Sequence, residues 1–142
     1  MSQSELVVKA TDGRTRLVVE VKARKNMPLS WASEFRRNVM AHGWVPAKSY
    51  FLIATADRFF LWTDDAEINS PPEYEQKARD IGAHWPILNH MDEANREGLE
   101  LLISAWLNIL THLDHLPNDD WLIRSGLFDA IKHGTVQMNN AA

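Results

Sequence analysis

Two charged residues stand within a segment of the chain that otherwise has the composition of a buried β-strand. The segment RLVVEVKARKN (residues 16 to 26) is rich in valine, yet Glu20 and Lys22 interrupt the apolar run. Because successive side chains of a strand point to opposite faces, Glu20 and Lys22 share one face. The pattern fits either a solvated face with a local ion pair or an active site that uses both charges.

A second carboxylate comes from the preceding β-rich segment, which begins at Glu5. The intervening Asp12-Gly13 dipeptide is a strong signal for a two-residue hairpin turn. In that register the numbers of paired residues sum to 25, so Glu5 faces Glu20. Two carboxylates directly opposite each other repel. The pair therefore calls for a shared proton, a nearby cation or a bound metal ion.

A divalent metal ion would relieve this repulsion and bring chemistry with it. The carboxylates of Glu5 and Glu20 and the backbone carbonyl of Val21 are hard oxygen ligands of the kind that Mg²⁺ or Mn²⁺ prefers. Such an ion can activate water and stabilise charge on a phosphate, and Lys22 would position the water or neutralise the same group. Asp12 is an alternative first acid, but its place in the turn already explains it.

The order of these features resembles the PD-(D/E)XK nuclease superfamily, above all the small archaeal Holliday-junction resolvases and restriction-enzyme-like domains. The resemblance covers about the first 63 residues and includes the segment SYFLIATADRFFLW. It implies that Glu5, Glu20 and Lys22 are catalytic, that the metal is Mg²⁺ (or Mn²⁺) and that DNA is the substrate. Two departures stand out: the family usually has Asp in place of Glu5, and it has a helix before the first acid.

Basic residues gather close to this segment. Arg24 and Lys25 follow the strand, and Arg36 and Arg37 lie in the next predicted helix. We expect these four residues to contact phosphate, although for any one of them a solvated strand end or helix face is the somewhat better explanation. The net charge of residues 1–60 is +5, and that of residues 61–142 is −9. A nucleic-acid surface, if present, is therefore local to the N-terminal half.

Hydrophobic periodicity predicts the elements that position these residues. Two strands flank the hairpin, a helix runs from an N-cap at Ser30 to a stop at Gly43, and two further strands lie near 49–54 and 58–63. In the remaining chain the pattern predicts three helices, over residues 71–82, 92–113 and 118–134. A frayed tail is expected at residues 135–142.

These elements predict an α/β (α+β-like) fold, with a restriction-endonuclease-like mixed sheet in β-β-α-β-β order and a C-terminal helical cap. We expect a single domain, 1–142, with a nuclease-like core at 1–66 and the cap at 71–134. The helix over 92–113 carries Leu101, Leu107 and Ile109 away from its main apolar stripe, which favours a homodimer through the C-terminal helices.

Composition narrows the classes of protein further. The chain of 142 residues has no cysteine, which excludes disulfides and thiolate chemistry. The N-terminus lacks the pattern of a signal peptide, and no stretch is apolar enough to span a membrane, so we expect a cytoplasmic protein with no membrane partner.

The sequence predicts a Mg²⁺-dependent DNA phosphodiesterase, endonuclease-like. The alternatives are an inactive binding or assembly module of the same fold and an unrelated α+β protein.

Overall fold

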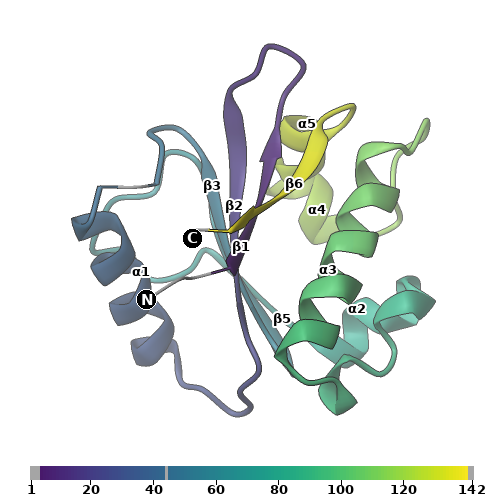
Figure 1. Cartoon of the computed structure of the whole chain (residues 1–142), viewed down its shortest axis with the longest axis horizontal. Helices are drawn as coiled ribbons and strands as arrows, with labels where there is room; N and C mark the ends of the chain where they lie inside the picture. Colours follow the sequence, from purple (N-terminus) through teal and green to yellow (C-terminus); the bar gives the residue numbers. More distant parts are fainter. Residues whose placement is uncertain (1–3, 44, 141–142) are drawn as a thin grey trace.

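A six-stranded mixed sheet organises the chain, with helix α1 on one face and helices α2 to α5 on the other (Figure 1). The computed structural model describes residues 4–43 and 45–140. The strand order is β5-β4-β3-β2-β1-β6. The strands are β1 Ser4–Lys9, β2 Thr15–Lys22, β3 Tyr50–Thr55, β4 Arg58–Trp62, β5 Tyr74–Lys77 and β6 Thr135–Asn140. The helices are α1 Leu29–Ala41, α2 Ala78–His84, α3 Arg96–Thr111, α4 Asp120–Arg124 and α5 Leu127–Ile131, with 3₁₀ turns at Pro86–Leu88 and Met91–Glu93.

The predicted β-β-α-β-β order is confirmed for the first five elements, β1 to β4 with α1. Strands β2 and β3 are parallel and α1 connects them, whereas every other neighbouring pair is antiparallel. Helix α1 begins one residue before the expected cap: Pro28 is the N-cap and Ser30 lies inside the helix. The predicted stop is confirmed, because Gly43 adopts φ 71 directly after the C-cap residue.

The hairpin between β1 and β2 differs from the predicted two-residue turn at its tip. Gly13 donates its N–H to the carbonyl of Ala10 (2.9 Å), and Ala10 donates to the carbonyl of Arg14 (2.8 Å). The Ala10–Arg14 bond leaves Thr11, Asp12 and Gly13 in the loop, one residue more than expected, and Gly13 adopts positive φ (88°). A register shift follows at Val8/Lys9, and Lys9 pairs with Thr15. The expected sum of 25 would pair Lys9 with Arg16, so the predicted register was wrong at this position.

Hydrogen bonds within the turn explain Asp12. Its carboxylate accepts the backbone N–H of Arg14 (3.0 Å) and the Nε–H of the same residue (2.8 Å). These contacts hold the pKa of Asp12 below its ordinary value. Asp12 therefore has a structural role in the hairpin turn.

The sheet separates two apolar cores. On the α1 side, Val7, Val18 and Phe51 pack with Trp62 and the helix residue Ala32. The larger core lies between the other face and α2 to α5. Its fully buried members include Leu6, Val19, Leu52, Phe59, Ile103, Trp106 and Leu122. Alternation along β2 sends its odd-numbered apolar residues into the larger core and leaves the even-numbered positions, including 20 and 22, facing α1.

The C-terminal half departs most from prediction. Residues 71–82 do not form one helix: 74–77 form β5, which pairs with β4, and α2 starts only at Ala78. Residues 118–134 form two short helices instead of one, because Gly126 adopts φ 82 between α4 and α5. The tail is not frayed up to Asn140, since β6 pairs with β1 over its whole length. The sheet is therefore built from both halves of the chain.

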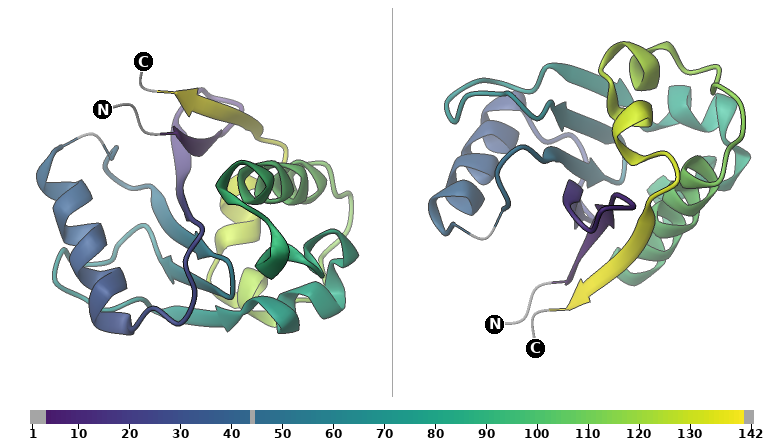
Figure 2. Two further views of the ribbon diagram at one scale, coloured as in Figure 1. Left: turned by 60° about the horizontal axis from the view of Figure 1, so that its bottom comes forward. Right: turned by 90° about the horizontal axis from the view of Figure 1, so that it is seen from above.

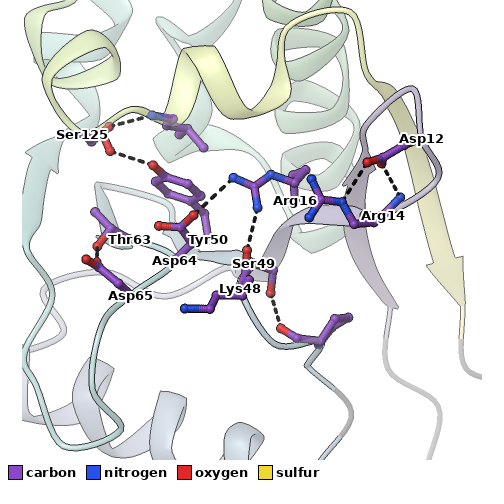
Figure 3. Close-up of polar contacts among 12 residues, drawn as sticks. Asp12, Arg14, Arg16, Lys48, Ser49, Tyr50, Thr63, Asp64, Asp65 and Ser125 are labelled. Atoms are coloured by element: carbon purple, nitrogen blue, oxygen red, sulfur yellow. Dashed lines mark hydrogen bonds and ion pairs between the residues drawn. The ribbon is translucent and has the colours of Figure 1, made fainter.

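A polar network fixes the end of the sheet at which β2 and β3 begin (Figure 3). Arg16 donates to the carbonyl of Lys48 (2.8 Å) and to Asp64 (3.2 Å). The buried Tyr50 donates its hydroxyl hydrogen to the carbonyl of Ser125 (2.8 Å), which links β3 to the break between α4 and α5. Burial raises the pKa of Tyr50 to about 12.

Substitution of Gly126 tests this link. An alanine Cβ at position 126 would lie 2.6 Å from the Tyr50 hydroxyl oxygen. The alanine would also have to adopt φ 82, a backbone conformation that residues with a side chain rarely adopt. We expect Gly126→Ala to lower the free energy of unfolding by about 2–4 kcal/mol in urea denaturation.

Gly13→Ala is the matched control for Gly126→Ala. Gly13 also has positive φ (88°), but an added Cβ there meets nothing within 4 Å. It should therefore cost only the backbone strain, about 1 kcal/mol. Equal losses in the two variants would contradict the steric argument.

Candidate functional site

The candidate site lies on the α1 face of the sheet, where β2 carries Glu20 and Lys22. Glu20 is nearly fully buried, at 1% exposure, and its oxygen Oε2 is shielded from solvent. Its partner on β3 is Ile53, and Phe51 and Val18 belong to the same apolar cluster. A carboxylate in such surroundings is costly unless a proton, a cation or hydrogen bonds balance its charge. The burial of Glu20 therefore excludes the interpretation that it lies on a solvent-exposed strand face.

Cross-strand pairing brings a second acid to this position, as predicted. Glu5 and Glu20 are direct Cα partners in the β1–β2 ladder. Directly paired residues share a face of the sheet. The side chain of Glu5 lies outside the described side chains, so the pairing rests on the backbone register.

Strand β6 extends the same register by one residue that the sequence reasoning missed. Asn139 is the Cα partner of Glu5, which places Asn139, Glu5 and Glu20 in one row across β6, β1 and β2. The uncharged, polar tail sequence gave no local signal for this, because the pairing joins residues more than 130 positions apart.

Lys22 contacts the helix that covers the site. Its Nζ lies 4.8 Å from the centroid of the Phe35 ring, within the range of a cation–π interaction. Lys22 is half-buried and pairs with Thr55 on β3. The aromatic ring thus positions the ammonium group on the same face as Glu20. In the sequence, Phe35 was recognisable only as an apolar residue at helical spacing.

The other expected ligand and phosphate contacts lie in different surroundings. Val21 is aligned with Ala54 in the parallel ladder, and its side chain packs in the larger core. Arg24 and Lys25 are exposed just after β2. The carbonyl of Arg24 accepts the N–H of Ala56, which ties this segment to the turn after β3.

Arg36 has a structural environment that differs from the expected phosphate contact. It is 4% exposed, and its guanidinium lies 5.3 Å from the Trp62 ring. The guanidinium donates to the carbonyls of Glu67 (2.9 Å), Ile68 (3.4 Å) and Ala66 (3.4 Å). Desolvation lowers the pKa of Arg36 from its ordinary value. Arg36 anchors the loop after β4 to α1, whereas its neighbour Arg37 is half-buried.

Two cavities in the described part of the chain have linings that do not include the candidate residues. One of these cavities, of about 260 Å³, is lined by residues that include His84 and Asp119. The other, of about 370 Å³, is lined by residues that include Arg58 and Arg79. Neither is lined by Glu20 or Lys22. Among the side chains that the structure describes, which exclude that of Glu5, no group of three or more His, Asp or Glu is arranged to hold a metal ion.

Comparison with known proteins adds no family. No protein-family model matches the chain, and no curated protein or solved structure matches it significantly. No helix in the described part of the chain is long and apolar enough to cross a membrane.

Proposed function

We propose that this protein is a Mg²⁺- or Mn²⁺-dependent phosphodiesterase that cleaves DNA, endonuclease-like. The observation that carries the proposal is the direct pairing of Glu5 with Glu20, with Lys22 two residues further along the same strand. Two carboxylates and a lysine on one sheet face match the residues that the resemblance to PD-(D/E)XK nucleases implies. The β-β-α-β-β order and the parallel β2–β3 pair are consistent with a restriction-endonuclease-like core.

The donor set fits a hard divalent cation. Glu5, Glu20 and the carbonyl of Val21 would hold the ion, because carboxylate and carbonyl oxygens are the ligands that Mg²⁺ and Mn²⁺ prefer. When bound, the ion supplies an activated water and stabilises charge on the phosphate. The burial of Glu20 lowers the local dielectric constant and strengthens its attraction for a cation.

The residues of the chain itself would supply the remaining functions. Lys22, held over the ring of Phe35, would donate a hydrogen bond to the attacking water or to a phosphate oxygen. The exposed Arg24 and Lys25 would contact the DNA backbone beside the scissile phosphate, and the half-buried Arg37 of α1 is a further candidate contact. Arg36 is left out of this set, since its guanidinium is already bound to the loop after β4.

A second candidate is a catalytically inactive module of the same fold that binds or assembles with a partner. The observation that favours it is the 1% exposure of Glu20, together with a cation–π contact that already occupies Lys22. In this alternative the Glu5–Glu20 pair shares a proton, and neither metal nor substrate enters.

Two measurements separate these candidates. Supercoiled, linear and branched DNA are incubated with the protein and Mg²⁺ or Mn²⁺, and Mn²⁺ binding is measured in parallel by electron paramagnetic resonance. The proposal expects cleavage that requires the metal and is lost in Lys22→Ala. Mn²⁺ binding without cleavage would leave a metal-binding module, and the absence of both would refute the phosphodiesterase.

The contact between Lys22 and Phe35 gives a further prediction. Phe35→Leu keeps an apolar side chain on α1 but removes the ring that faces the Lys22 ammonium. We expect cleavage to fall by about tenfold, since a cation–π contact is worth roughly 0.5–2 kcal/mol and here holds the lysine in place. Mn²⁺ affinity should stay unchanged, because Phe35 is not a metal ligand. A parallel loss of Mn²⁺ binding would show that α1 itself had moved.

A further inference from the structure

The cavity of about 260 Å³ has a polar lining that the candidate nuclease site does not use. Both views in Figure 2 show the helices of the C-terminal half together on the side of the sheet opposite α1, and the cavity belongs to that side. Three elements supply its polar residues: Tyr74 and Gln76 of β5, Asp80 and His84 of α2, and Asp119, Asp120 and Arg124 at the start of α4.

Asp119 is a buried carboxylate in this lining, at 4% exposure. Its Oδ2 accepts the indole N–H of Trp85 (2.9 Å). Its Oδ1 accepts no hydrogen bond from the part of the chain that the structure describes, and Nδ1 of His84 lies 3.4 Å from it. A buried carboxylate is costly unless donors or a positive charge balance it. Asp119 is therefore fixed by Trp85, with its second oxygen beside the histidine ring.

His84 lies between this carboxylate and solvent, because its side chain is 49% exposed. A carboxylate beside Nδ1 favours the tautomer that carries its proton on that nitrogen. In this neutral form the other ring nitrogen, Nε2, is a hydrogen-bond acceptor. Asp119 thus positions His84 as an acceptor for a ligand in the cavity.

The charges around the cavity leave an excess of negative groups. Arg124 is paired with Asp120 (2.8 Å), so these two charges offset each other. Asp80 is exposed and forms no ion pair with any side chain that the structure describes. It lies one helical turn before His84, on the same face of α2. The lining therefore presents a carboxylate and an imidazole acceptor side by side, which favours a ligand with a positive charge and N–H donors.

Aromatic residues complete the lining. Tyr74 and Trp121 both line the cavity, and the ring of Trp121 is stacked on that of Trp106 with centroids 6.3 Å apart. Aromatic rings attract cations through their electron-rich faces. The volume of about 260 Å³ lies below that of sites for drug-sized ligands, so it suits a ligand with few heavy atoms.

We propose that this cavity binds a small organic cation, an alkylammonium or guanidinium group. Asp80 supplies the counter-charge, Nε2 of His84 accepts an N–H of the ligand, and Asp119 is the positioning residue that keeps His84 an acceptor. The inference is independent of the proposed nuclease activity, because neither Glu20 nor Lys22 lines the cavity.

The binding test uses the isotope-labelled full chain and amide NMR at about pH 8, above the ordinary titration range of histidine. The probes are butylguanidinium, butylammonium, neutral butanol and inorganic phosphate. The two cations should shift the indole N–H resonance of Trp85, which donates to Asp119, and should saturate with a Kd of about 1 mM. Butanol and phosphate should not. No saturation by either cation at about tenfold higher concentration, or equal binding of butanol or phosphate, would overturn the proposal.

A blocked arginine amide distinguishes the two sources of such a cation. Tighter binding than butylguanidinium would support the site and assign it to a basic side chain of a partner protein. Equal or weaker binding would support the site and assign it to a free small cation.

Asp80→Asn removes an exposed charge and should raise the Kd of both cations by about fivefold. Asp92→Asn is the matched control, because Asp92 is also exposed but lines the other cavity. It should leave the Kd unchanged, and an equal rise in the two variants would overturn the assignment of the site.

The role of Asp119 has a spectroscopic readout. The ring-nitrogen resonances of His84 should report a proton on Nδ1 in the wild type and a shift of that proton towards Nε2 in Asp119→Asn, with cation binding lost. The amide spectrum of the variant shows whether it is folded. A proton on Nε2 in the wild type itself would overturn the proposed role without any variant.

Discussion

Glu20→Gln will lose both Mn²⁺ binding and DNA cleavage, the largest loss expected from any single substitution at the candidate site. The change keeps the size of the side chain but removes the negative charge from a residue that is 1% exposed. A metal ion held as proposed would lose a charged ligand at a position that solvent hardly reaches. We expect cleavage to fall by at least about 100-fold, since changes to residues that only orient metal ligands already cost 10- to 100-fold.

Glu100→Gln is the matched control. Glu100 is also a buried carboxylate, at 6% exposure, but it lies on α3 on the opposite side of the sheet and contacts Arg96 (3.7 Å). The same chemical change there should leave metal binding and cleavage intact. If Glu20→Gln retained Mn²⁺ affinity and cleavage, or if Glu100→Gln lost them equally, Glu20 would not be a metal ligand.

Lys22→Ala separates the two charges of the strand. Lysine carries no acceptor for a metal ion, so this variant should bind Mn²⁺ and still fail to cleave. A split of this kind distinguishes a role at the phosphate from a role in holding the metal.

Trp106→Ala is expected to cause the largest loss of stability among core substitutions. Trp106 is fully buried on α3, and its ring lies 5.3 Å from that of Phe59 and 6.3 Å from that of Trp121. Removing it empties the centre of the larger core between the sheet and the helices. We expect the free energy of unfolding to fall by about 3–5 kcal/mol in urea denaturation.

Trp106→Phe should cost far less. The smaller ring retains much of the contact with Phe59 and Trp121. It also removes the buried indole N–H, which donates to no acceptor among the described residues. We expect a loss of about 1–2 kcal/mol. A loss as large as that of Trp106→Ala would mean that the indole N–H makes a contact on which the fold depends.

The amino-acid sequence by itself determined the centre of the sheet. Valine-rich β-segments, the Asp12-Gly13 turn and the apolar spacing of α1 are local signals, and they placed β1 to β4 correctly. The pairing of Glu5 with Glu20 also followed from the sequence. The hairpin tip is one residue longer than predicted, yet the compensating shift at Val8/Lys9 leaves the register beyond it unchanged.

Only the tertiary structure decided the two edges of the sheet. The segments YEQK and TVQMNN carry few apolar residues, and each becomes a strand because a distant strand, β4 or β1, offers it backbone hydrogen bonds. The same holds for Gly126, where Tyr50, 76 residues earlier in the chain, occupies the space beside it. From the sequence, Arg36 was expected on the surface of the protein. In the structure it is buried, and its guanidinium donates to backbone carbonyls about 30 residues away in the chain. The local sequence determines the intrinsic secondary-structure preference and the apolar periodicity of a segment. Strand pairing between segments far apart in the chain depends instead on which strand edge still has unpaired backbone groups once the core has formed.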